Sequence, residues 1–208
     1  MKTAGLPPHY NDLALSFERA WAILADGVQN RKGAGHVPVV ASVDAAGQPR
    51  QRVMILRQAD CAQRRLRFHT DVRSTKTAEL EDGAQVAVLV YSVDEKVQLR
   101  IGGTAHIDPD SATADLAWQQ STTFARRCYM AGDAPGTSTE GPTSGLPSSV
   151  EGKQPTEDDL AEFRRNFAVI WVDVVGIEYL YLANSGHRRA RWQWDEMRQN
   201  WSGDWLVP

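Results

Sequence analysis

The chain has 208 residues, of which 42% are hydrophobic and 24% charged. This is the balance of an ordinary globular protein, and the length suits the single domain that we expect over residues 1–208. A formal net charge of -3 argues against the broad basic surface that nucleic acids and anionic membranes attract. With no membrane-spanning apolar run and no signal-peptide pattern at the N-terminus, we expect a cytoplasmic protein without nucleic-acid or membrane partners.

The first half of the chain changes from helical to strand periodicity. Apolar residues at helical spacing over residues 11–28 predict an amphipathic helix, which Asn11 or Asp12 can cap. Residues 37–43 and 50–56 predict a hairpin, and residues 66–70 a third strand. Residues 75–81 predict a short helix capped by Ser74. Two long strands follow over residues 85–93 and 97–107, and the pair Gly102–Gly103 indicates a bend or bulge in the second.

The second half begins with a predicted helix over residues 112–127. Residues 131–156 are rich in Gly, Pro, Ser and Thr and predict a long flexible loop, either a functional lid or an insertion. Thr156 can cap a helix that runs to residue 167, and strands are predicted over residues 168–175 and 178–182. This order of elements indicates a β-rich α+β protein rather than a doubly wound sheet.

The basic block between Arg52 and Lys76 carries the clearest chemical signal. Arg52 and Arg57 flank an apolar strand, Thr70 ends the next strand, and Ser74 and Lys76 open a helix. Hydroxyl and cationic groups of this kind bind phosphate. The alternative is a solvated strand rim beside a ligand-free helix cap. One difficulty is parity: Arg52 and Arg57 are an odd number of residues apart, so a regular strand sends them to opposite faces.

These residues resemble the FMN site of the pyridoxamine 5'-phosphate oxidase family, whose fold is a split antiparallel β-barrel with peripheral helices. In that family the motifs R-x-V-L-L-K, F-[YF]-T-N and S-R-K hold the cofactor, and a glutamine on a later strand contacts the flavin. The corresponding pieces have matching spacing. The resemblance implies that FMN is bound by Arg52, Val53, Met54, Ile55, Arg57, His69, Thr70, Ser74, Thr75, Lys76, Gln98 and Arg191. It also implies a homodimer with FMN at the subunit interface.

The departures from the family motifs concern the substrate. Thr75 replaces a basic residue at the helix start, and Ala190 replaces the histidine of the family's C-terminal R-L-H-D-R signature, where Arg188 matches the first arginine. The family's residues for the substrate phosphate have no clear counterparts; Trp118, Arg126 and Arg127 are candidates by neighbourhood alone. The cofactor site is therefore better kept than the vitamin B6 site, which indicates a branch of the family distinct from the oxidase.

The resemblance implies an FMN-dependent oxidoreductase of unknown small-molecule substrate, with Arg188 as the candidate catalytic residue and no metal. A second hypothesis is a flavin-binding carrier or sensor without turnover. A third, weaker hypothesis is nucleic-acid binding by the tail, where tryptophans alternate with arginines. We favour a core or interface strand for this tail, because Trp192 and Trp194 share one strand face.

Overall fold

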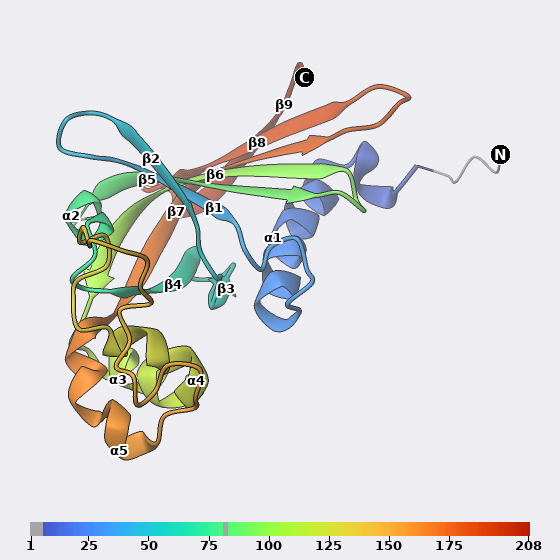
Figure 1. The fold of residues 1–208 in the computed structure, drawn as a ribbon. Helices are drawn as coiled ribbons and strands as arrows, with labels where there is room; N and C mark the ends of the chain where they lie inside the picture. The colour runs from blue at the N-terminus through green and yellow to red at the C-terminus, as the bar shows by residue number, and fades with distance from the viewer. Residues whose placement is uncertain (1–5, 81–82) are drawn as a thin grey trace.

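The computed structural model describes residues 6–80 and 83–208, and the strands in this part of the chain form one antiparallel sheet (Figure 1). The strands are β1 (Val39–Val43), β2 (Pro49–Val53), β3 (Gln58–Asp60), β4 (Arg65–Asp71), β5 (Ala84–Ser92), β6 (Val97–Asp108), β7 (Phe167–Tyr181), β8 (Arg188–Asp195) and β9 (Asn200–Leu206). Their order is β2-β1-β5-β6-β7-β4-β3, and β8 joins β7 and β9. The predicted β-rich α+β class with a split barrel is confirmed.

Strand β7 organises the sheet because its two halves have different neighbours on one side. β6 pairs with β7 along nearly its whole length, whereas β4 pairs with residues 167–173 and β8 with residues 176–181. The register shifts between Gly102 and Gly103, as the glycine pair predicted. A Cβ at Gly103 would lie 2.5 Å from the Asp173 carbonyl oxygen, so only glycine allows this close approach.

Helix α1 (Leu13–Gln29) covers the main core at one end of the sheet (Figure 1). The Asp12 side chain accepts a hydrogen bond from the Leu15 N–H at 2.9 Å, so Asp12 rather than Asn11 is the cap. Ala20, Trp21 and Leu24 are buried against the sheet. The short 3₁₀ helix η1 (Pro8–Tyr10) precedes α1.

A second, smaller core forms where short helices gather beside the first half of β7. These are α3 (Ala112–Gln120), α4 (Thr123–Arg126), η2 (Arg127–Met130), α5 (Glu157–Leu160) and η3 (Ala161–Asn166). Trp118 and Tyr129 pack edge to face at 5.6 Å, and both contact Phe167. This helical layer is separate from α1 and lies at the lower left in Figure 1.

Several predicted boundaries are wrong. The single helix over residues 112–127 is broken because Thr122 caps a new helix, α4. The two strands over residues 168–175 and 178–182 are one strand, β7. The predicted strand over residues 50–56 ends at Val53 as β2, and β3 was not predicted. None of the described helices has the length and apolarity needed to cross a bilayer.

The short helix after β4 also differs from its prediction. Helix α2 (Lys76–Glu79) begins after Thr75, and the predicted end at Glu81 lies outside the described residues. Ser74 does not cap the helix, because its hydroxyl donates to the Asp71 carbonyl oxygen at 2.7 Å. The Ser74 oxygen is thereby left to accept hydrogen bonds from side chains.

The loop over residues 131–156 runs along the helical layer and is held at both ends. The Arg73 guanidinium donates to the carbonyl oxygens of Ala131 and Gly132 at 2.9 and 3.2 Å. Val150 is buried in the second core. The loop is therefore packed on the helices, away from the cavity described next.

Candidate functional site

A cavity of about 640 Å³ opens between the end of β2, strand β4, helix α2 and the helical layer. Its lining is strongly basic and contains no carboxylate. The residues that line it are Arg31, His36, Arg52, Val53, Met54, Ile55, Arg57, His69, Lys76, Phe124, Ala125, Cys128 and Tyr129. Seven of these were predicted from the sequence as cofactor-binding residues: the five from residues 52–57, His69 and Lys76.

The path of the chain after β2 resolves the parity difficulty between Arg52 and Arg57. Regular strand geometry ends at Val53, and the next residues are held by hydrogen bonds from the Met54 N–H to Pro38 and from the Leu56 N–H to His36. The Arg57 N–H then donates to the Arg67 carbonyl oxygen at 2.8 Å. Both arginines line the same cavity, with Arg57 at the point where the chain changes its hydrogen-bond partner from the segment at His36 to strand β4.

Lys76 lies at the centre of a small hydroxyl cluster. Its Nζ donates to the Thr70 Oγ1 at 3.1 Å and to the Ser74 Oγ at 2.9 Å. Thr70 and Ser74 are buried, and no described carboxylate pairs with Lys76. Burial and the nearby positive charge of Arg52 lower the pKa of Lys76. An ammonium group without an anionic partner, beside two hydroxyls, is an arrangement that fits a phosphate group.

Arg52 is held differently from Lys76. Its Nη1 donates to the Ser42 Oγ at 2.5 Å, and its Nη2 forms an ion pair with Glu79. The Ser42 hydroxyl also donates to the Glu79 carboxylate at 2.6 Å. Arg52 and Lys76 both line the cavity, whereas Ser74 does not line it and lies against Lys76.

Arg57, Arg67 and His69 form a second positive region deeper under the helical layer. The Nε atoms of both arginines and the Nε2 atom of His69 are buried and have no hydrogen-bond partner among the described residues. Burial, Arg57 and Arg67 lower the pKa of His69 to about 3, so its ring is neutral at physiological pH. His69 packs edge to face on Phe167 at 4.8 Å.

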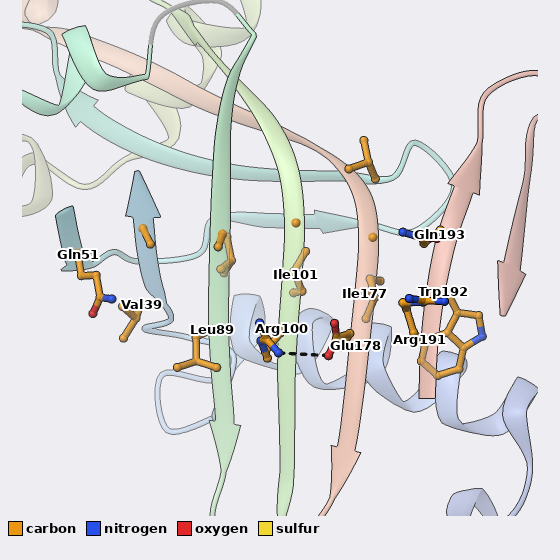
Figure 2. A pocket seen from close by; sticks show the side chains of 16 residues that line it. Val39, Gln51, Leu89, Arg100, Ile101, Ile177, Glu178, Arg191, Trp192 and Gln193 are labelled. Carbon is orange, nitrogen blue, oxygen red and sulfur yellow. Dashed lines mark hydrogen bonds and ion pairs between the residues drawn. The ribbon is translucent and has the colours of Figure 1, made fainter. Parts of the chain in front are cut away.

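The remaining predicted site residues lie outside this cavity. Thr75 faces a neighbouring hollow, and Arg188 donates to Asn11 and stacks on Tyr10 near the C-terminus. Gln98 and Arg191 belong to strands β6 and β8, and Arg191 lines a separate groove of about 450 Å³ (Figure 2). Within one protomer, these residues are not brought together with Lys76.

The groove occupies the open face of the sheet. Figure 2 shows Val39, Leu89, Arg100 and Glu178 side by side on neighbouring strands. Leu89 and Tyr91 on β5 are 41% and 49% exposed, and Val43 on β1 is 54% exposed. Exposed apolar side chains in such a row are typical of a surface that another protein covers.

The helical layer supplies residues that sequence reasoning missed. Phe124, Ala125, Cys128 and Tyr129 form the roof of the cavity, and Arg31 and His36 come from the segment after α1. The neighbourhood candidates have other roles: Trp118 is buried in the second core, Arg126 pairs with Glu157, and Arg127 donates to the Lys153 carbonyl oxygen. No periodic signal in residues 121–130 distinguishes the roof residues from their neighbours.

Comparison with known proteins agrees with this arrangement. Residues 18–109 match the family described as pyridoxamine 5'-phosphate oxidase, FMN-binding domain. A pyridoxamine 5'-phosphate oxidase-related, FMN-binding protein from Nostoc punctiforme superposes with a TM-score of 0.70 at 22% identity, covering 99% of this chain and 100% of its own. PhzG from Burkholderia lata, solved in complex with tetrahydrophenazine-1-carboxylic acid, gives a TM-score of 0.69 at 19% identity, with 100% of both chains covered.

No curated protein matches the sequence. The two structural relatives share the fold over their whole length, while the family match covers the segment that contains Arg52, His69, Lys76 and Gln98. The C-terminal strands, with Arg188 and Arg191, lie outside the matched segment. Residues 18–109 are thus similar to the FMN-binding domain of the pyridoxamine 5'-phosphate oxidase family, within a chain that has the split-barrel fold of the two structural relatives.

Proposed function

We propose that the cavity binds FMN, with the phosphate at Lys76, Thr70 and Ser74. The observation that carries this proposal is the ammonium group of Lys76, which is half-buried and has two hydroxyl partners but no carboxylate among the described residues. Placing such a cation there is unfavourable unless an anion balances it. A phosphate would accept hydrogen bonds from the Lys76 ammonium group, and from the Thr70 and Ser74 hydroxyls once these turn away from the Asp71 carbonyl oxygen.

The flavin would extend from this point along residues 52–57. Val53, Met54 and Ile55 offer their backbone and apolar side chains, and Arg57 lies at the far end of the same segment. Bound FMN would supply the redox chemistry, by accepting a hydride from a reduced substrate. The protein would supply the position and the electrostatic environment. We therefore propose an FMN-dependent oxidoreductase.

We also propose that the substrate is a small anionic molecule. Arg57 and Arg67 present buried nitrogen atoms that no described residue satisfies, and guanidinium groups bind carboxylate and phosphate bidentately. The relative from Burkholderia lata was solved with a carboxylic acid, which fits this chemistry. The aromatic rings of Phe124 and Tyr129 at the roof suit a planar organic acid.

The working unit is proposed to be a homodimer. The apolar face with Val43, Leu89 and Tyr91 would be covered by a second copy of the chain. Gln98 and Arg191 project from strands of this face, so a partner protomer could bring them to the cofactor of its neighbour. This accounts for their distance from Lys76 within one chain.

The experiment that tests FMN binding is a titration monitored by flavin fluorescence, with wild type, Lys76→Met and the control Lys153→Met. The variant Lys76→Met removes a charge-assisted contact of about 1.5–3 kcal/mol. It should therefore bind FMN roughly tenfold to a hundredfold more weakly than wild type. Lys153 is exposed on the distant loop, so its variant should bind as wild type does. Equal affinity for all three proteins would contradict the placement of the phosphate.

A carrier or sensor remains the second candidate, because Ala190 stands where the oxidase family has a histidine. Rapid mixing of the reduced, FMN-loaded protein with oxygen and with candidate acceptors separates the two functions. Fast, acceptor-dependent return of the flavin absorbance supports the oxidoreductase. Recovery no faster than that of free reduced flavin supports the carrier.

A further inference from the structure

Arg52 belongs to a closed three-membered network with Ser42 and Glu79. Both Nη atoms of its guanidinium are engaged, one by the Ser42 hydroxyl and one by the Glu79 carboxylate. Ser42 in turn donates to the same carboxylate oxygen, Oε2, at 2.6 Å. The side chains of Arg52 and Glu79 are only 19% and 10% exposed, so the pair is largely shielded from solvent.

This network lies beside the proposed phosphate site. Glu79 follows Lys76 by three residues on helix α2, and residues at that spacing are neighbours on a helix surface. Positive charge on Arg52 lowers the pKa of Lys76, whereas the charge on Glu79 opposes this shift. The three charges are therefore close enough to affect one another.

Arg52 lines two hollows. One is the basic cavity with Lys76, and the other is an open hollow in which the carboxylates of Glu79 and Asp44 balance the guanidinium groups of Arg52 and Arg50. Burial disfavours the charged form of Glu79, but hydrogen bonds from Ser42 and Arg52 outweigh this effect and lower its carboxyl pKa. Glu79 is thus an anion at physiological pH, close to the positive charges of Arg52 and Lys76 at the proposed cofactor site.

We propose that Glu79 is a built-in counter-anion of the phosphate site, which holds Arg52 in place and limits the affinity of the site for FMN. The inference rests on the proposed FMN site. With Arg52 and Lys76 positive and Glu79 negative, the three groups present one net positive charge to a phosphate that carries up to two negative charges. Glu79 competes with the phosphate for Arg52 and also repels it.

Replacing Glu79 by glutamine removes the charge but keeps an oxygen that can accept from Ser42 and Arg52. The orientation of Arg52 is then preserved, and only the electrostatic effect is lost. Removing one like charge beside the proposed phosphate, in a partly buried site, should tighten FMN binding about tenfold. Riboflavin, which lacks the phosphate, should bind with unchanged affinity.

The test is a fluorescence titration of wild type, Glu79→Gln and Glu79→Met with FMN and with riboflavin, after thermal unfolding has shown which variants fold. Methionine has a similar volume and no charge, so the test can use whichever of the two variants folds. Asp44→Asn is the matched control, because Asp44 lines the same hollow but pairs with Arg50 rather than Arg52. Its ratio of FMN to riboflavin affinity should stay within twofold of wild type.

The expected result is a ratio of FMN to riboflavin affinity about tenfold higher in the neutral variants than in wild type. A ratio that falls would overturn the proposal and make Glu79 a residue that positions Arg52 for binding. An unchanged ratio would overturn it too. If wild type itself shows no preference for FMN over riboflavin, the phosphate site fails and this inference with it.

Discussion

The cavity and the sheet groove both contain arginine or lysine side chains, but the groove arginines pair with carboxylates, whereas among the described cations of the cavity wall Arg52 alone does so. In the groove region, Arg100 and Arg189 share the Glu178 carboxylate, and Arg191 lies 3.8 Å from Asp204. In the cavity, Lys76 and Arg57 have no carboxylate partner in the described part of the chain. Cations paired with carboxylates are typical of an ordinary protein surface. Cations without such a partner beside a cavity indicate that the cavity binds an anionic ligand.

The two regions also differ in what they leave exposed. The groove presents apolar side chains from β1 and β5, which suit a protein partner. The cavity presents guanidinium groups, the Lys76 ammonium group and a neutral histidine, which suit a small ligand. This difference supports the proposal that the groove serves dimerisation and that the cavity binds the cofactor.

The largest expected effect is at the groove. Ala41 lines it, and an aspartate there would be buried without a partner if a second protomer covers the face. An uncompensated buried charge costs about 3–5 kcal/mol, so Ala41→Asp should convert a dimer to monomers. Light scattering after size exclusion measures the mass. Ala112→Asp, on exposed helix α3, is the control and should leave the mass of wild type unchanged.

The next effect concerns His69 and the pH dependence of stability. Its pKa is about 3 in the folded protein against an ordinary 6.5, so the unfolded chain binds a proton that the folded chain does not. Stability should therefore fall as the pH drops from about 6.5 towards 3, by about 1–2 kcal/mol between pH 7 and 5. Urea unfolding at the two pH values measures this difference.

The variant His69→Phe should reduce that difference, because it removes the titrating group and keeps an aromatic ring against Phe167. His187 is exposed, so His187→Gln should retain the pH dependence of wild type. If the free energy of unfolding of His69→Phe depended on pH as strongly as that of wild type, His69 would not be held neutral by its surroundings.

A smaller effect is expected at Thr70, whose Oγ1 accepts from Lys76. Thr70→Val keeps the shape of the side chain but removes one hydrogen bond to the cluster. A hydrogen bond contributes about 0.5–1.5 kcal/mol, so FMN affinity should fall roughly threefold to tenfold. Thr113→Val, at an exposed position of helix α3, is the control. The FMN affinity of both variants is measured by fluorescence titration. If both bind FMN as wild type does, the Thr70 hydroxyl is not part of the site.

The smallest effect is expected at Arg100, a balanced cation of the groove. Its side chain is 60% exposed, and Glu178 keeps a second partner in Arg189. Exposed ion pairs contribute about 0–1 kcal/mol, so Arg100→Met should change the free energy of unfolding by less than about 0.5 kcal/mol. Chemical denaturation measures it. A larger loss would mean that the groove charges are not simple surface pairs.

Much of the basic cavity wall could be predicted because it is local in sequence. Residues 52–57, His69 and Lys76 come from neighbouring segments whose spacing is visible in the chain, and the structure places them around one cavity. The fold class was predicted for a similar reason, since strand periodicity and turn residues are local signals.

The rest depends on contacts between distant segments. The pairing of Arg52 with Glu79 and Ser42 joins three elements, and nothing in the sequence indicates which carboxylate an arginine will meet. The roof formed by Phe124 and Tyr129 depends on how the helical layer packs on β7. Neither could be found without the tertiary structure.

The measurement that tests the central claim most directly is the affinity of the wild-type protein for FMN compared with riboflavin. If Lys76, Thr70 and Ser74 bind the phosphate, FMN should bind more tightly by about tenfold to a hundredfold, the effect of one or two charge-assisted hydrogen bonds. Equal affinities would contradict the account, because the unbalanced Lys76 would then have no part in recognising the cofactor.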